Sequence, residues 1–483
     1  MASNQTSTIL LRGGTVLVHE GNKVNALPEY DVLIEGGRIS QIGQELDVPE
    51  GGTVLSCYHK IVSPGFIDTH HHLWQSQLKG RHGDQSFMAY MVAGNFQSYN
   101  YTSDDIFWGQ LAGSLESIDG GVTTVVDHAH MTYSPEHATA AIRATASSGL
   151  RSVFCYSLIS RFKDWTESTI EIDEEKIPDW WAQTLSSLAQ LQPFGEGRVS
   201  LGLGFDVFSL PKEKIINLYK TARNLGVKLI TSHYVAGRIP DIPQFLAENG
   251  ILGKDVLLSH ACGISEMNAT LLQQNEAYVS STPDTELQMG VGEPIAFRDD
   301  IKPIASIGVD CHANNSSDIL TQIRISLQHA RGTHNASASQ ARQYPSIQIK
   351  LEEAFNLGTI QGAKAINQEH EIGSIEIGKR ADIVIFDTRS PSMVCAAEEN
   401  PLAAIILHAS VRDIDTVIID GKIRKQAGRL ADTELYNQLN ESSGEIVSWE
   451  QVVDHLLKSR VHIKEKGEDQ NIQLGMGAVS KIW

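Results

Sequence analysis

The chain has few cysteines, no long apolar run and no excess of basic residues. Its 483 residues include five cysteines with no C-x-x-C pair, namely Cys57, Cys155, Cys262, Cys311 and Cys395. We therefore expect no disulfide framework and a reducing, cytoplasmic location. No run of 18 apolar residues occurs, so we expect no membrane span. Residues 1–5 have neither a basic start nor an apolar core, so we expect no signal peptide.

The charge balance is strongly acidic. Asp and Glu number 58 against 39 Lys and Arg, which gives a formal net charge of −19. Nucleic acid and anionic membranes are not attracted to such a surface, so we expect neither as a partner. Apolar residues make up 41% of the chain and charged residues 20%, as in a globular enzyme with a small-molecule substrate. At this length, one large domain and one smaller domain are expected.

Short strands are predicted at both ends of the fold. Residues 1–62 contain apolar runs separated by glycine pairs such as Gly36-Gly37, which is the pattern of hairpins. Residues 366–430 return to this pattern, with Asp420-Gly421 as a tight turn between two runs. We predict that these two segments form one small, discontinuous β-sandwich.

The tail, residues 431–483, is predicted to be helical. Ser448 has Gln451 three residues later, which is the arrangement of a capping box. A helix is therefore expected to begin after Ser448 and to run to about Lys458.

The middle of the chain, residues 63–365, alternates strand-like runs with amphipathic stretches such as 212–225 and 242–249. Besides the run that precedes His70, the strand candidates are Val122–Val126, Arg151–Tyr156, Val199–Gly204, Lys228–Ser232, Val256–Ser259, Ala277–Ser281 and Ala305–Val309. Eight such units predict an α/β fold with a (β/α)8 TIM-like barrel. The alternative, an open doubly wound sheet, lacks its glycine-rich fingerprint after an early strand. In such barrels the chemistry lies at the carboxyl ends of the strands.

The first barrel strand ends in three histidines. The segment Pro64-Gly65-Phe66-Ile67-Asp68-Thr69-His70-His71-His72 is apolar at its start. Alternate side chains of a strand point the same way, so His70 and His72 can aim at one point while His71 faces elsewhere. Two converging imidazoles suit a divalent metal, although three adjacent histidines also suit an exposed polar turn.

Three further strands end in His233, His260 and Asp310. A single strand-end histidine is more often structural, but four strands of one barrel with such ends surround the same mouth. Three imidazoles and a carboxylate suit Zn²⁺, with Fe²⁺ or Mn²⁺ as alternatives. Asp310 is the natural base for a water at such a metal, and His260 can orient that water and stabilise charge on the attacked centre.

Jointly, the motifs resemble the metal-dependent amidohydrolase superfamily, in the branch of cytosine, guanine and S-adenosylhomocysteine deaminases and triazine chlorohydrolases. They are the segment 64–72, the strand ends, Gly121-Val122-Thr123-Thr124-Val125-Val126-Asp127-His128 and Gly378-Lys379-Arg380-Ala381-Asp382. The resemblance implies a barrel with a β-sandwich built from both chain ends. It also implies four ligands to one metal, His70, His72, His233 and Asp310, and two catalytic residues, Asp310 and His260.

The resemblance further implies hydrolysis of a C–N bond, or loss of another leaving group, in a cyclic or heteroaromatic molecule. Binuclear members carry a carboxylated lysine at the end of the fourth strand, but the segment 199–206 here ends in Phe205-Asp206. We therefore expect one metal ion. Homo-oligomers are common in the superfamily, and no sequence feature sets a subunit number here.

Substrate contacts are predicted at five positions near the mouth. The run that ends in Trp74 and Gln75 resembles members that act on oxidised guanine, so these side chains are expected to stack on and hydrogen-bond a ring. Packing in the core is an equal alternative for Trp74. His128 and Tyr234 follow strands at the same mouth. His312, in the loop after the eighth strand, is expected either to reach the substrate or to bond to a neighbour.

One departure from the branch concerns proton transfer. Typical deaminases carry His-x-x-Glu after the fifth strand, where the Glu protonates a ring nitrogen, but the Glu position here is Ala236. General acid–base help contributes about 10²–10⁴-fold. Tyr234, Asp284 or Glu286 are candidate replacements. The alternatives are a substrate that needs no such acid, a non-hydrolytic lyase or isomerase on the same scaffold, and a barrel retained only for binding.

Overall fold

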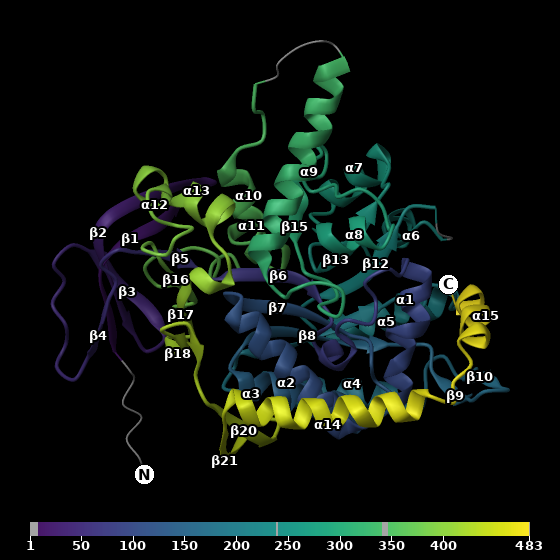
Figure 1. Cartoon of the computed structure of the whole chain (residues 1–483). Helices are drawn as coiled ribbons and strands as arrows, with labels where there is room; N and C mark the ends of the chain where they lie inside the picture. Colours follow the sequence, from purple (N-terminus) through teal and green to yellow (C-terminus); the bar gives the residue numbers. More distant parts are fainter. Residues whose placement is uncertain (1–7, 238–239, 341–345, 483) are drawn as a thin grey trace.

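The computed structural model describes residues 8–237, 240–340 and 346–482. The segment on which the signal-peptide expectation rests, residues 1–5, lies outside the described residues. Figure 1 shows a barrel flanked by a sheet of strands from both chain ends, with a long helix, α9 (Ile319–Gln340), that projects from the body. Among the described helices, none is both long enough and apolar enough to cross a membrane.

Eight parallel strands form the barrel, as predicted. In order around the sheet they are β6 (Phe66–His71), β7 (Val122–Ala129), β8 (Arg151–Leu158), β11 (Val199–Phe205), β12 (Ile230–Val235), β13 (Val256–Cys262), β14 (Tyr278–Ser281) and β15 (Ala305–Ile307). The seam between the first and last strands is closed just beyond β15. There His72 N donates to Asp310 O at 2.9 Å and Asp310 N donates to His70 O at 2.7 Å.

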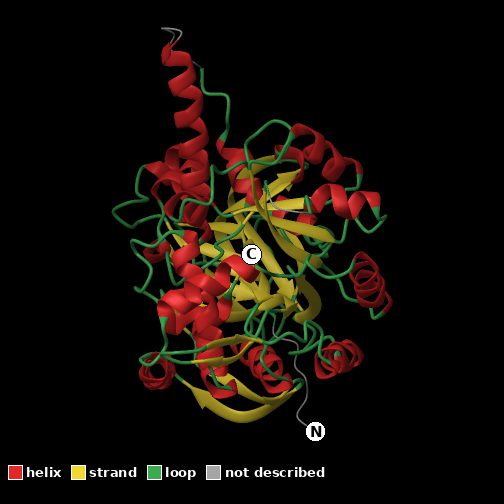
Figure 2. Cartoon of the chain, turned by 90° about the vertical axis from the view of Figure 1, so that its right-hand side faces the viewer, coloured by secondary structure: helices red, strands yellow, loops and turns green. Residues whose placement is uncertain are grey.

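Helices surround the barrel strands (Figure 2). Besides α9 they include η1 (Leu73–Leu78), α1 (Phe87–Ala93), η2 (Asn95–Asn100), α2 (Ser103–Asp119), α3 (Pro135–Ser148), α4 (Asp179–Leu191), α5 (Lys212–Asn224), α6 (Ile242–Glu248), α7 (Glu266–Gln274), α8 (Pro283–Gln288), η3 (Lys302–Ile304), α10 (Leu351–Leu357) and α11 (Ile360–Ala365). A short hairpin, β9 (Phe162–Trp165) and β10 (Ile170–Ile172), precedes α4. The amphipathic stretches 212–225 and 242–249 form α5 and α6. In α5 the buried residues Ile215, Tyr219 and Ala222 are three or four residues apart and therefore lie on one helical face.

Strands from both chain ends join in one nine-stranded sheet. They are β1 (Ile9–Glu20), β2 (Lys23–Glu35), β3 (Arg38–Gly43), β4 (Thr53–Ser56), β5 (Lys60–Pro64), β16 (Ile383–Asp387), β17 (Ile414–Ile419), β18 (Lys422–Gln426) and β19 (Arg429–Leu430). The two segments meet where β5 pairs antiparallel with β16. Between β16 and β17 lie α12 (Ala396–Glu399), α13 (Pro401–Ala403), η4 (Ala404–His408) and η5 (Val411–Asp413). The exact domain boundaries stay predictions.

The prediction of a helical tail was wrong for its first third. Residues 433–447 form an antiparallel hairpin, β20 (Thr433–Gln438) and β21 (Glu441–Val447), which packs on α3. Ser448 then caps α14 (Trp449–Gly467) through the predicted capping box with Gln451, and α15 (Ile472–Ile482) follows. Helix α14 packs along α2 on the outside of the barrel (Figure 1).

Candidate metal centre

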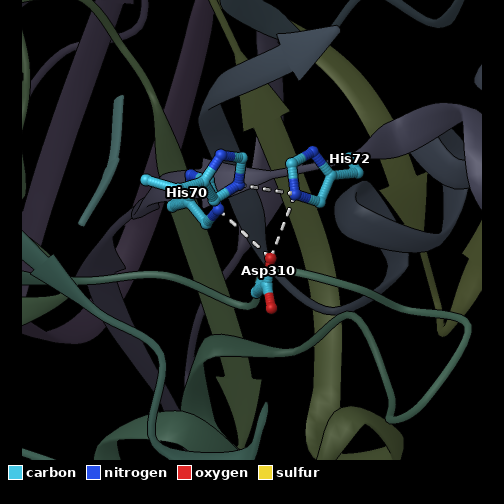
Figure 3. Close-up of side chains that lie close together, drawn as sticks. His70, His72 and Asp310 are labelled. Carbon is cyan, nitrogen blue, oxygen red and sulfur yellow. Dashed lines mark hydrogen bonds and ion pairs between the residues drawn. The ribbon is translucent and has the colours of Figure 1, made fainter. Parts of the chain in front are cut away.

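Four side chains converge at the carboxyl end of the barrel, as predicted from their strand positions. The Nε2 atoms of His70 and His72 each lie 3.1 Å from Asp310 Oδ1, and His233 Nε2 lies 3.3 Å from His72 Nε2. All four donor atoms lie within 4.8 Å of one another. Figure 3 shows the imidazoles of His70 and His72 and the carboxylate of Asp310 directed at one another. A cation at their centre would be within reach of every donor.

The hydrogen bonds on the far side of each ring decide which nitrogen faces the centre. His72 Nδ1 donates to the backbone oxygen of His128 at 2.8 Å, and His233 Nδ1 donates to Asp206 Oδ2 at 2.9 Å. Since a neutral imidazole carries one proton, the Nε2 atoms of these two rings present lone pairs. His70 Nδ1 is likewise held, at 2.7 Å, by the hydroxyl of Ser259.

The donor set therefore fits a divalent metal. Two lone-pair nitrogens 3.3 Å apart, together with a carboxylate oxygen, repel one another unless a cation lies between them. Burial lowers the pKa of His233 to about 4 and that of His70 well below its usual range, so both rings are in the neutral form that binds metal. Burial alone would raise the pKa of Asp310, but the adjacent imidazoles of His70 and His72 hold it well below its ordinary value.

The two predicted catalytic residues adopt an unusual backbone conformation. His260 has φ +70° and Asp310 has φ +67°, in the left-handed region that non-glycine residues seldom occupy. Such strain persists where the surrounding structure enforces it, and it gathers at functional sites. His260 Nδ1 is bonded to Thr282 Oγ1 at 2.8 Å and lies 3.8 Å from the buried carboxylate of Glu286. The ring therefore has a fixed orientation beside Asp310.

The model of the amidohydrolase family matches residues 61–424. The chain belongs to the amidohydrolase family. This membership confirms the predicted class, a metal-dependent hydrolase of carbon–nitrogen bonds that uses one divalent ion. It also agrees with the barrel and with the strands contributed by both chain ends.

Three proteins illustrate what this amidohydrolase is similar to. A 5'-deoxyadenosine deaminase of Methanobrevibacter smithii is 27% identical over 89% of this chain and 98% of its own length. Among solved structures, an adenosine deaminase of Xanthomonas campestris with bound zinc has a TM-score of 0.77 at 17% identity, covering 95% of this chain and 99% of that one. An atrazine chlorohydrolase of Arthrobacter aurescens, complexed with zinc, has a TM-score of 0.73 at 18% identity, covering 94% and 100%.

Most of the predicted substrate contacts do not lie at the metal centre. Trp74, Gln75, Tyr234 and His312 are all buried, and each is bonded to another protein group. Trp74 Nε1 donates to His130 Nδ1, Gln75 donates to Tyr90 and Tyr234 donates to Asp241. Their polar atoms have protein partners, and their role as substrate contacts stays a prediction.

His312 and His128 are also engaged within the protein. His312 bonds to His71 at 2.7 Å. Of the two alternatives for this residue, the structure shows the one in which it bonds to a neighbour. His128 is fully buried, and its Nε2 lies 3.1 Å from Asp206 Oδ2. It therefore helps to hold the carboxylate that orients His233. The neighbouring imidazoles of His233 and His128 outweigh burial and hold the pKa of Asp206 well below its usual range.

Two adjoining cavities reach the centre and share His130 and His233 in their lining. The smaller one contains His72, His260 and Asp310. The larger one adds Asp206, three aromatic side chains and three short polar ones: Phe96, Tyr133, Phe208, Ser98, Ser160 and Ser209.

Sequence reasoning missed His130 and Asp206. His130 stands two residues after His128 beyond β7, so the spacing that singled out His70 and His72 also marked this pair. Asp206 directly follows β11. The sequence argument used this position only to show that the lysine of the binuclear members is missing.

Proposed function

We propose that the protein is a mononuclear metal-dependent aminohydrolase that removes an amino group from a heteroaromatic small molecule. The convergence of three imidazoles and one carboxylate beside a cavity with aromatic and polar walls carries the proposal. The curated relatives that act on adenine-containing molecules, such as the 5'-deoxyadenosine deaminase, support the choice of ring. We assign the metal to His70, His72, His233 and Asp310, with zinc as the ion.

A divalent cation bound there lowers the pKa of water at the site toward neutrality. Asp310 is placed to take the proton of the attacking water, since it lines the smaller cavity and its pKa keeps it ionised. His260 lines the same cavity and, with its ring oriented by Thr282, stabilises the charge that develops beside the attacked carbon. Asp206 keeps His233 in the tautomer that the centre needs.

The missing acid at Ala236 is not replaced by any of the three predicted candidates. Tyr234 is bonded to Asp241, Glu286 accepts hydrogen bonds from Ser281 and Thr282, and neither lines the cavities. Asp284 is not in their lining either. We assign the contact with the ring nitrogen to another side chain of the cavity wall, His130.

His130 has the required hydrogen bond. Trp74 Nε1 can only donate, and it lies 3.1 Å from His130 Nδ1, so this nitrogen accepts. The proton of the neutral His130 ring is then on Nε2, and the ring lines both cavities. A fixed N–H donor there would hold a ring nitrogen and polarise the carbon that water attacks.

The test is a panel of amino-substituted heterocycles, from adenosine and 5'-deoxyadenosine to guanine, cytosine and aminotriazines, incubated with zinc-loaded protein. We expect ammonia release from at least one ring, loss of that release in Asp310→Asn, and one ¹⁸O atom from labelled water in the product. Turnover of none of these rings by fully zinc-loaded protein would refute the proposal.

A second candidate is hydrolytic loss of a different leaving group, such as chloride, from the same kind of ring. Ala236 favours it, because expulsion of a stable anion does not need a strong acid at the ring nitrogen. Halide release from chlorotriazines, measured beside ammonia release from aminotriazines, separates the two candidates. The lyase or isomerase alternative predicts product without ¹⁸O, and family membership favours hydrolysis over it.

Location and assembly complete the proposal. All five cysteines are unpaired and four of them are buried, which supports a reducing, cytoplasmic environment. Homo-oligomerisation stays a prediction, and light scattering of the purified protein would give the number of subunits.

A further inference from the structure

A buried chain of hydrogen bonds runs beside the metal centre without entering it. Asp68 Oδ2 is 2.6 Å from His71 Nδ1, His71 Nε2 is 2.7 Å from His312 Nδ1, and His312 Nε2 is 3.1 Å from Ser76 Oγ. Asp68 and His71 are 0% exposed, His312 1% and Ser76 4%. Neither His71 nor His312 has a role in the proposed reaction. Burying two imidazoles that bond to each other costs free energy, which points to a function for the pair.

The chain ties together the two segments that carry the metal ligands. Asp68 Oδ1 accepts from the backbone N–H of His70 and from that of Val309, each at 3.1 Å. It therefore spans the seam between β6 and the end of β15. Through His71 and His312 the same network reaches the loop that begins at Asp310.

The loop beyond the seam needs such support. Asp310 has a left-handed backbone, φ +67°, which an aspartate does not adopt without compensation elsewhere. Two residues later, the His312 ring is held from both sides, by His71 and by Ser76 of η1. Helix α2 leaves space for this ring: a Cβ added at Gly113 would lie 2.7 Å from His312 Cε1.

We propose that His71 and His312 are positioning residues whose hydrogen bond holds Asp310 over His70 and His72. The inference rests on the proposed metal site and adds what sets its affinity. The backbone bonds of the seam fix strand against strand, and the His71–His312 bond fixes the loop that turns the Asp310 carboxylate toward the imidazoles. Outer groups that orient metal ligands typically change metal affinity 10–100-fold when they are removed.

The experiment compares zinc affinity among variants by competition with a chromophoric chelator. His312→Leu removes the bond to His71 at similar size, and we expect zinc to bind about 10–100-fold more weakly. His312→Asn places a side-chain amide near the position of Nδ1, where its oxygen or nitrogen can bond to His71, and we expect it to recover most of the affinity. Rescue by this conservative change is not expected of a residue that only fills space.

His137→Leu is the matched control. His137 is another buried histidine with two hydrogen bonds, to Ser134 Oγ at 2.9 Å and to the oxygen of Tyr101 at 3.0 Å, and it lies on α3 outside the metal group. It should lower the free energy of unfolding of the zinc-free protein as His312→Leu does, with zinc affinity unchanged. If His312→Leu does not fold, Ser76→Ala removes the far end of the chain and should weaken zinc several-fold.

Each outcome decides the matter. Weaker zinc binding in His312→Leu, recovery in His312→Asn and no change in His137→Leu support the proposal. Equal zinc affinity in wild type and His312→Leu, or in Ser76→Ala where the first variant fails to fold, overturns it. A wild-type protein that takes up no zinc at all would refute the metal site itself, and the positioning role with it.

Discussion

At the residue scale, the role of each histidine here is decided by the partner of its other ring nitrogen. His72 faces a backbone oxygen and His233 a carboxylate, so both present Nε2 lone pairs to a metal. His130 faces an indole N–H, which reverses the pattern and leaves an N–H donor. The same residue type thus supplies ligands and a hydrogen-bond donor within one pocket, and substitutions of the partners test the assignment.

Asp310→Asn should abolish most activity. The amide keeps the shape of the carboxylate but carries no negative charge and takes no proton from water, so we expect the rate on the substrate identified in the panel to fall about 10²–10⁴-fold. Zinc content should fall as well, because a charged ligand is lost. Asp104→Asn, an exposed carboxylate on α2, is the control. Wild-type kinetics in Asp310→Asn, measured at equal zinc content, would contradict its assignment as the base.

Trp74→Phe should lower kcat/KM by about tenfold, because a lost neutral hydrogen bond is typically worth about 1 kcal/mol and here it sets the tautomer of His130. Trp181→Phe is the matched control: it is also a fully buried tryptophan, with its Nε1 donating to Ser157 O at 3.0 Å. Both variants should lose similar stability in urea unfolding. Equal kcat/KM in the two variants would argue against the link from Trp74 to His130.

At the element scale, a buried ion pair joins the barrel to the sheet of the chain ends. Arg151 at the start of β8 donates to both oxygens of Asp382, just before β16, at 2.8 and 3.1 Å, and both side chains are less than 10% exposed. Asp382 also accepts from the backbone N–H of Asp420 in the β17–β18 turn. The aspartate that ends the motif 378–382 is thus a structural joint rather than a catalytic group.

Asp382→Asn should lower the free energy of unfolding by about 3–5 kcal/mol, because the buried Arg151 charge loses its two shorter bonds and keeps the 3.4 Å contact with Asp420 Oδ1. Chemical denaturation of the zinc-free protein measures this. The control is Glu371→Gln, which breaks the exposed pairs with Arg38 and Arg380; the Glu371 side chain is 48% exposed and the two arginines are 39% and 33% exposed. That change should cost less than about 1 kcal/mol. Equal losses of unfolding free energy in the two variants would show that burial of the Arg151–Asp382 pair does not increase its contribution to stability.

The elements that sequence alone predicted are those whose signals are local. Barrel strands are continuous apolar runs, and the Asp420-Gly421 turn carries its own conformation, with φ of +53° and +73°. The hairpin 433–447 was missed because its stability comes from distant partners. Tyr436 N donates to Ser147 Oγ and Arg143 Nε donates to Tyr436 O, both from α3. No local pattern in the tail records these contacts.

At the scale of the whole molecule, the convergence of the four proposed ligands was predictable because a parallel barrel gathers all strand ends at one mouth. Which side chains face the cavity was not, since it depends on loops that fold across the mouth. Trp74 and His312 follow metal ligands closely in sequence yet turn into the core, whereas His130 lines the cavity. Hydrogen-bond partners far apart in sequence decide between these outcomes, as with Trp74 and His130.

Acid stability of the whole fold should depend on a histidine far from the centre. His19 of β1 is largely buried against α10, where its Nε2 is 3.1 Å from Asn356 Oδ1 and its ring stacks on Phe355. Burial lowers its pKa to about 4. The unfolded chain takes up this proton near pH 6.5 and the folded chain only near 4, so the unfolded state binds more protons between these values and stability falls as the pH falls.

The loss attributable to His19 should approach about 3 kcal/mol when the pH has dropped from 7.5 to about 4. Urea unfolding of the zinc-free protein across this range measures it, and His19→Gln, which does not titrate, should show a shallower decline than wild type. His370→Gln, at a site where the side chain is 91% exposed, should follow the wild-type curve because folding does not bury this ring. Parallel curves for wild type and His19→Gln would mean that His19 is protonated in the folded protein, and that β1 and α10 separate enough to admit the charge.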